Sequence, residues 1–280
     1  MKDVDVLTCH TGITPLEKRV YAAGMTDTGL RFELERAITE NELVLHYQPR
    51  VLVSTLAVRG VEALVRWRHP ERGMVPPGEF IAAAQRAGLM RDLDAWVVRE
   101  ALLQAGVWLR DDAGLGVSVN ISPSLLHDDP FLRLFERTLK IQGDPRRFTV
   151  EVAAQALGDT EHPVDGLTRM RERGVRLALD DVTVLADLEA ASWIKWEYVK
   201  LGRRLVTGAA KDAAAGATLR SIAARATELG SKVVAVGVED DAGMALLRDA
   251  GVYMAQGYLI APPLGVKELL AWSAARGKPI

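Results

Sequence analysis

Apolar residues recur along this chain in two alternating patterns. Short runs rich in Val, Leu and Ile alternate with longer segments in which apolar residues recur every three or four positions. The short runs are typical of buried strands and the longer segments of amphipathic helices. Strands are predicted at residues 44–48, 57–67, 116–121, 147–152, 175–179, 198–201, 232–238 and 252–254. The first strand is predicted to end at Pro49, because proline lacks the N–H that a sheet needs.

The helical pattern begins at Phe32 and returns after almost every strand. Residues 1–29 carry little periodicity and are predicted to form a tail, with a short helix at 15–23. Residues 30–280 are predicted to form one domain. Its later helices are expected at 79–87, 93–110, 130–141, 163–173, 186–193, 212–229, 242–250 and 266–275.

The alternation of strand and helix with short connections predicts a parallel sheet covered by helices. About eight such units in a chain of this length favour a closed (β/α)8 barrel of the α/β class. A doubly wound open sheet is the alternative. It would be expected to carry a glycine-rich phosphate loop after its first strand, and the sequence has none there.

Composition narrows the classes of partner. The chain has 280 residues, with 35 Lys and Arg against 37 Asp and Glu, and a formal net charge of −2. That balance gives no electrostatic reason to expect nucleic acid or an anionic membrane as a partner. The single cysteine, Cys9, cannot form an intrachain disulfide, and no Cys/His spacing resembles a zinc site. Without a signal-peptide core or an apolar run of ~18 residues, we expect a soluble, cytoplasmic protein.

Polar residues interrupt nearly every predicted strand. A parallel barrel strand is buried on both faces, so polar side chains inside it are costly unless they are paired or bind a ligand. The C-terminal ends of barrel strands meet at one mouth, where we expect these side chains to converge. They are Glu62, Arg66, Asn120, Glu151, Asp180, Asp181, Lys200 and Gln256.

The chemistry of this set favours a metal and a phosphate. Carboxylate and amide oxygens are the ligands that Mg²⁺ and Mn²⁺ prefer. A lysine and an arginine at the same mouth suit a phosphate ester. Any one of these residues could equally be a strand-end cap or part of a surface ion pair. The whole set is hard to explain that way, because one barrel rarely tolerates so many ionisable groups near its core.

Several short motifs give the chain a resemblance to a known family. Glu62-Ala63-Leu64 is followed by His69-Pro70, and the other motifs appear in the same order as in the family. The chain resembles the EAL-domain family over roughly residues 30–275. Members of that family are cyclic di-GMP phosphodiesterases or their catalytically silent relatives. The other motifs are Tyr47-Gln48-Pro49, residues 76–81, residues 119–122, Asp180-Asp181, Lys200, residues 237–239 and residues 256–258.

The resemblance implies a fold and a set of roles. The family fold is a (β/α)8-type barrel whose first strand runs antiparallel to the others. Its chemistry is hydrolysis of cyclic di-GMP to linear pGpG, in which two metal ions activate a water and stabilise the transition state. By resemblance, the first Mg²⁺ or Mn²⁺ is held by Glu62, Asn120, Glu151 and Asp180, and the second by Asp180 and Asp181. Lys200 would contact the attacking water with Gln256 beside it, Arg66 would bind a phosphate, and Gln48 and Pro77 would line the dinucleotide cleft.

The sequence departs from the family pattern where catalysis would occur. The family reads Ala-Glu-Gly-Val-Glu at the seventh strand, whereas residues 235–239 read Ala-Val-Gly-Val-Glu. In the family, the first glutamate of this motif is a ligand of the second metal and the proposed base. Val236 replaces it in this chain. Glu239 lies three positions after Val236, so it faces the opposite side of the strand, and it lies past the strand end. It is therefore a poor substitute for the missing glutamate. Residues 182–188 lack both glycines of the family loop, Ala154 replaces its anchoring Glu, and Gly202 replaces an Asp.

Three hypotheses follow from these residues. The first is a degenerate EAL-type protein that acts as a cyclic di-GMP receptor or a regulator that binds a protein partner, with one metal site retained. The second is an active, slow phosphodiesterase in which Asp181, Glu239 or a water completes the second site. The third is a partner-binding scaffold that no longer binds nucleotide. By analogy with the family, a homodimer through helices beside the 182–188 loop is also expected.

Overall fold

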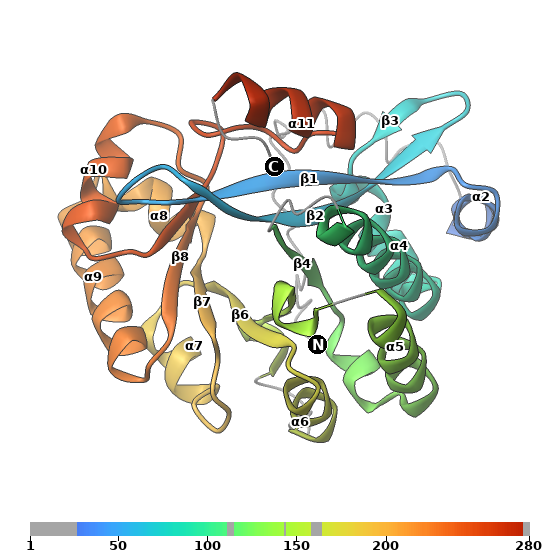
Figure 1. The fold of residues 1–280 in the computed structure, drawn as a ribbon, viewed down its shortest axis with the longest axis horizontal. Helices are drawn as coiled ribbons and strands as arrows, with labels where there is room; N and C mark the ends of the chain where they lie inside the picture. The colour runs from blue at the N-terminus through green and yellow to red at the C-terminus, as the bar shows by residue number, and fades with distance from the viewer. Residues whose placement is uncertain (1–26, 111–114, 143, 158–163, 277–280) are drawn as a thin grey trace.

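The computed structural model describes residues 27–110, 115–142, 144–157 and 164–276 (Figure 1). Most of the predicted tail, including the helix expected at 15–23, lies outside these residues. The first described helix, α2 (Asp27–Thr39), crosses the predicted boundary between tail and domain. No helix in the described parts of the chain has both the length and the hydropathy of a membrane span.

Eight strands form a closed barrel, which confirms the predicted fold class. From β2 to β9 each barrel strand runs parallel to the next, and β1 is antiparallel to both β2 and β9. The expected reversal of the first strand is therefore confirmed. The strands are β1 (Leu43–Leu52), β2 (Val58–His69), β4 (Gly116–Asn120), β5 (Phe148–Ala153), β6 (Arg176–Val182), β7 (Tyr198–Leu201), β8 (Lys232–Val236) and β9 (Met254–Gln256), with β3 (Gly73–Val75) added antiparallel to β2.

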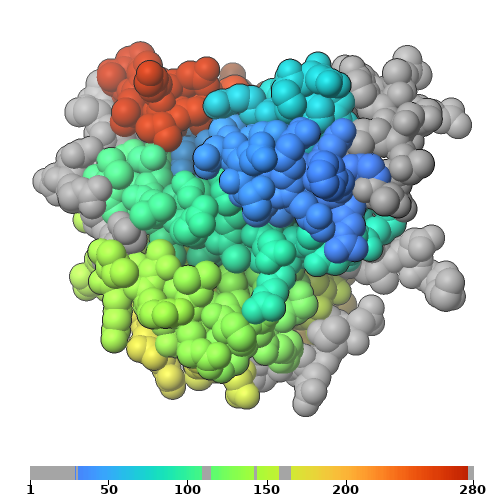
Figure 2. Space-filling view, turned by 90° about the vertical axis from the view of Figure 1, so that its right-hand side faces the viewer, coloured from blue at the N-terminus to red at the C-terminus, as the bar shows by residue number. Residues whose placement is uncertain are grey.

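Helices surround the barrel (Figure 1). Their apolar faces and the outward faces of the strands make the main hydrophobic core. The side view shows α2, in blue, lying beside the chain drawn in cyan to green, and α2 contacts both α3 and α4 (Figure 2). The helices are α3 (Pro77–Arg86), α4 (Met90–Arg110), α5 (Asp129–Gln142), α6 (Val164–Glu172), α7 (Leu185–Ala190), α8 (Arg203–Ala209), α9 (Ala213–Glu228), α10 (Asp241–Asp249) and α11 (Val266–Ala275), with 3₁₀ turns η1 (Pro123–His127), η2 (Pro145–Arg147) and η3 (Ala154–Leu157).

The prediction that the first strand ends at Pro49 is wrong. The strand β1 continues to Leu52, with Pro49 opposite Val61. Tyr47 exchanges two backbone hydrogen bonds with Leu264, on the side of β1 away from β2. By the alternation of a strand, the nitrogen of Pro49 faces the same side. No hydrogen bond to β2 is therefore lost at the proline, and the strand passes through it.

Other elements differ from the prediction as well. The short strand β3 and the helix α8 are absent from it, because each is too short to show a clear period. The strand β6 runs past the predicted end at residue 179 to Val182, through a register shift that includes Asp180 and Asp181.

The barrel interior is built in layers, with an apolar layer below a polar one. Ala178, Tyr198, Val234 and Met254 form a small buried cluster separate from the main core. Successive residues on one face of a strand are two positions apart. The residues two positions further along are therefore also interior, one layer nearer the C-terminal mouth. They are Asp180, Lys200, Val236 and Gln256.

A close backbone contact fixes the position of Gln256. A Cβ atom at Gly257 would lie 2.2 Å from both the backbone nitrogen and the carbonyl oxygen of Val238. We predict that Gly257→Ala lowers the free energy of unfolding by about 2 kcal/mol or more, because the segment after β8 must move. Denaturant unfolding measures the change. Gly208→Ala is the control, because Gly208 lies in the helix α8 and its added methyl group would make only ordinary van der Waals contact with Ala215. An equal loss of stability in both variants would contradict the prediction.

Candidate active site

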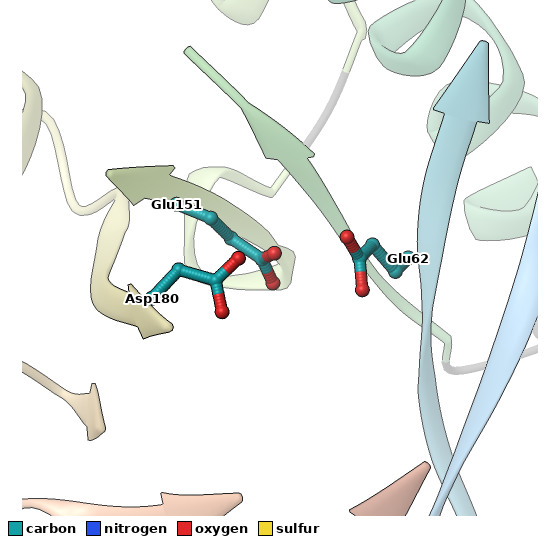
Figure 3. Close-up of side chains that lie close together, drawn as sticks. All are labelled: Glu62, Glu151 and Asp180. Atoms are coloured by element: carbon teal, nitrogen blue, oxygen red, sulfur yellow. The ribbon is translucent and has the colours of Figure 1, made fainter. Parts of the chain in front are cut away.

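Three buried or partly buried carboxylates converge inside the mouth of the barrel. Glu62 of β2, Glu151 of β5 and Asp180 of β6 each offer an oxygen, and these three atoms lie within 4.8 Å of one another. Figure 3 shows the three side chains pointing toward one another from separate strands. Like charges at this distance repel, so the cluster requires positive charge or protons to exist.

Lys200 supplies one positive charge at the centre of the cluster. Its ammonium lies 3.2 Å from Glu62 Oε2 and 3.1 Å from Asp180 Oδ2, and it also donates to Glu151 Oε2. Burial alone would lower the pKa of Lys200, but the three adjacent carboxylates outweigh it and raise the pKa above its usual value. The lysine is therefore held protonated and is not a general base in this state.

Arg50 of β1, which lies one layer below the carboxylates in the barrel interior, supplies a second positive charge. Its NH1 atom lies 3.2 Å from Glu151 Oε1, and both side chains are almost completely buried. Glu151 thus contacts a protein cation at each of its oxygens. Its pKa is nevertheless raised, because burial and the negative charge of Glu62 outweigh the attraction of Lys200 and Arg50.

Amide side chains surround Glu62 at the same layer. Asn120 Nδ2 donates to Glu62 Oε1 at 2.9 Å, and Gln256 Nε2 donates to Glu62 Oε2 at 2.8 Å. Gln256 also donates to Gln48 Oε1, and Gln48 Nε2 donates to the carbonyl of Ala261. The buried Oε1 atom of Gln256 has no hydrogen-bond partner among the described residues.

This donor set fits one divalent cation. Oxygen ligands from three carboxylates and an amide are typical of Mg²⁺ and Mn²⁺. The carboxylate oxygens are already gathered, and the unpartnered amide oxygen of Gln256 is a further acceptor at the same layer. The expected residues Glu62, Glu151 and Asp180 are thus brought together, with Asn120 held against Glu62.

The donor set for a second ion is less complete. Asp181 lies outside the three-carboxylate group, and its Oδ1 atom would be 2.3 Å from a Cβ at Gly202. Val236 is buried but belongs to neither apolar cluster, so an isopropyl group lies at the polar layer of the barrel. Glu239 lies apart from the cluster, where it forms an ion pair with Arg203 and its side chain is 47% exposed.

The loop after β6 is ordered by a single carboxylate. Asp187 Oδ2 accepts the backbone N–H of Thr183 at 2.8 Å and of Val184 at 3.0 Å. Gln155 Nε2 donates to the carbonyl of Asp181, which itself has a φ of 55°. The left-handed residue is therefore Asp181, and the loop needs no glycine at residues 183–185.

An apolar pocket opens beside the cluster. Leu64, Ile81, Met90 and Asn120 help to line it, and Asp94 of α4 is a buried carboxylate in its wall. The backbone N–H of Ser122 donates to Asp94 Oδ2 at 2.9 Å. Burial raises the pKa of Asp94 to about 6 against the opposing effect of Ser122.

Two of the expected binding residues lie near this pocket. Pro77 is the first residue of α3, the helix that contributes Ile81 to the pocket. Arg66 follows Glu62 by four positions on the same strand face and is half-buried, with NH1 donating to the carbonyl of Val65. Asn120 is common to the two features, because it lines the pocket and donates to Glu62 of the carboxylate cluster.

The sequence matches the EAL domain family over residues 31–263. The chain belongs to the EAL domain family. It is 33% identical over 255 residues to the cyclic di-GMP phosphodiesterase PA2567 of Pseudomonas aeruginosa, covering 85% of this chain and 41% of that protein. It is 34% identical over 265 residues to an uncharacterized signaling protein of Caulobacter vibrioides, covering 92% of this chain and 32% of that protein. The chain thus spans about two fifths or less of the length of these relatives.

One solved structure agrees with the membership, and a second has the same fold. The MucR phosphodiesterase in complex with c-di-GMP is 30% identical, with a TM-score of 0.79, covering 86% of this chain and 100% of that one. The EAL domain of Xanthomonas citri FimX, also in complex with c-di-GMP, is 23% identical with a TM-score of 0.79, covering 86% of this chain and 95% of that one. The second likeness shows the fold alone.

Sequence reasoning missed two charged residues of this site. Arg50 shares the parity of Gln48 on β1, so a strand continued past Pro49 would have pointed it inward. Asp94 interrupts the apolar pattern of α4 between Leu93 and Val97, both of which are buried. A carboxylate at such a position is a signal of a buried hydrogen bond or a ligand.

Asp94 predicts a pH dependence of stability. Its pKa of about 6 in the folded protein exceeds the unfolded value of ~3.9, so folding binds its proton more tightly. The protonated Asp94 side chain therefore contributes roughly 2–3 kcal/mol to the free energy of unfolding. This contribution is complete below about pH 4 and is lost as the pH rises to about 6. Asp94→Asn should flatten this slope in urea unfolding at pH 4.5, 5.5 and 7. The exposed Asp92→Asn, on the same helix, should keep it; a slope unchanged by Asp94→Asn would contradict the prediction.

Proposed function

We propose that this EAL domain is a cyclic di-GMP receptor with little or no hydrolytic activity. The observation that carries the proposal is Val236, an aliphatic side chain at the polar layer beside a cation site that is otherwise largely assembled. Relatives named as cyclic di-GMP phosphodiesterases, and a structural relative in complex with c-di-GMP, support the nucleotide as ligand.

The pocket has the chemistry of a purine site. Apolar side chains such as Leu64 and Ile81 suit the face of a base, and the Asp94 carboxylate suits the N–H groups on the edge of guanine. Arg66 lies on the same face of β2 as Glu62 and would contact a phosphate, to which its guanidinium can donate two hydrogen bonds. One ligand that carries guanine and phosphate would therefore contact both halves of the site.

A divalent cation would be held by Glu62, Glu151, Asp180 and Asn120. When bound, it supplies Lewis acidity toward a phosphate oxygen. Gln256 and Asn120 would position Glu62 through their hydrogen bonds, and Lys200 and Arg50 pair with Glu151. Lys200, held protonated, would donate hydrogen bonds rather than accept a proton. No carboxylate of β8 is present to complete a second ion site or to act as the base.

The two alternatives make different demands on the site. A slow phosphodiesterase needs Asp181 or a water to complete the second site, since Glu239 is paired with Arg203. A scaffold without nucleotide binding needs a surface for a partner. Val184 and Leu185, both exposed beside the site, are the surface we propose for a protein partner or a second copy of the chain.

Calorimetry with cyclic di-GMP tests the receptor proposal. We expect micromolar or tighter binding, and we expect Arg66→Ala to weaken it at least about tenfold, because a charge-assisted bond to phosphate is lost. Arg59→Ala, an exposed arginine at the far end of β2, is the charge-matched control and should leave binding unchanged. No binding to the wild-type protein would favour the scaffold. Rapid formation of pGpG with Mg²⁺ or Mn²⁺ would favour the enzyme.

Restoring a carboxylate at position 236 tests whether its absence limits hydrolysis. We predict that Val236→Glu raises the rate of pGpG formation with Mn²⁺ by a factor of ~10 or more, equivalent to about 1.4 kcal/mol of barrier. Val236→Gln has nearly the same shape without the charge and should give no gain. If Val236→Glu folds and binds nucleotide but is no faster, the limitation lies in the 182–188 loop instead.

A further inference from the structure

Arg50 is a second buried cation in the barrel interior, in addition to Lys200. Arg50 lies on β1 opposite Gly60 of β2, one layer below the carboxylates. Its NH1 atom lies 3.2 Å from Glu151 Oε1 and its NH2 atom 3.4 Å from the carbonyl oxygen of Val61. Its Nε atom is buried without a partner among the described residues. Glu151 is the carboxylate that pairs with Arg50.

The space for this guanidinium is built into the neighbouring strands. A Cβ at Gly60 would lie 3.1 Å from Arg50 NH2 and 2.7 Å from the carbonyl oxygen of Gly116. The absence of a side chain at Gly60 thus leaves room in β2 that the guanidinium of Arg50 partly occupies. The burial of its side chain, only 4% exposed, shows that it is part of the interior and not a surface group turned inward.

The buried Arg50 changes the net charge of the carboxylate cluster. Three carboxylates face Lys200 and Arg50, so two of the three negative charges are already compensated by the protein when all are ionised. Arginine keeps its charge at all accessible pH values and cannot make way by losing a proton. A divalent ion on Glu151 would have to share that carboxylate with both protein cations, and it would be repelled by each of them.

We propose that Arg50 is a resident counter-ion of the carboxylate cluster that weakens its affinity for divalent cations. It acts through its ion pair with Glu151. The inference rests on the cluster being the cation site of the proposed function, but it does not require the nucleotide or its hydrolysis.

Titration with Mn²⁺ alone tests the inference. The free ion is followed by electron paramagnetic resonance, because its six-line signal falls as the ion binds. Arg50→Met removes the charge and keeps an apolar chain of similar reach. We expect the Kd for Mn²⁺ to fall at least tenfold in this variant of the full chain, whereas Arg50→Lys, which restores the charge, should stay within about threefold of the wild type. Arg59→Met, an exposed arginine of β2, controls for the change in net charge.

The outcomes separate the inference from the proposed function. An unchanged or weaker Mn²⁺ affinity in a folded Arg50→Met variant would overturn the inference, because Arg50 would then be organising the ligands instead of competing with the ion. If thermal unfolding shows that Arg50→Met does not fold, Arg50→Gln takes its place in the same comparison. If none of the variants binds Mn²⁺, the inference fails with the metal site. Calorimetry of cyclic di-GMP without metal then still decides the receptor proposal.

Discussion

The site of this EAL domain depends on compensating buried negative charge. Glu62, Glu151 and Asp180 lie within one cluster inside a barrel that excludes most water, where repulsion between carboxylates is strong. Lys200 contacts all three, and Arg50 contacts Glu151 from the layer below. Because these cations are part of the chain, the negative charge of the cluster is compensated by the protein itself.

The cost of burying charge also explains why the fold accommodates Val236 at this layer. A buried carboxylate is costly without a cation, and an apolar side chain of suitable size carries no such cost. The proposed loss of hydrolysis therefore does not imply a loss of folding. The neighbouring loop has its own support, since Asp187 binds the backbone of Thr183 and Val184 without using the metal site.

The layered interior connects the fold to the site. Ala178, Tyr198, Val234 and Met254 form an apolar layer, and the residue two positions further along each strand lies in the polar layer above. A slip of one residue in any of these strands would point the site residue out of the barrel. The packing of the lower layer is thus one of the factors that aim Asp180, Lys200 and Gln256 at the same point.

The sequence alone determined the barrel, its repeated strand and helix units, the antiparallel first strand through the family resemblance, and the residues of the carboxylate cluster. These follow from periodicity and from short motifs, which are local. Pairing across strands is not local. Only the tertiary structure showed that Lys200 pairs directly with three carboxylates, carried β1 through Pro49, and brought Arg50 to Glu151, which is 101 residues away in the chain. It likewise placed Asp94 in the pocket wall. Register and burial, which arise when distant strands meet, decided those contacts.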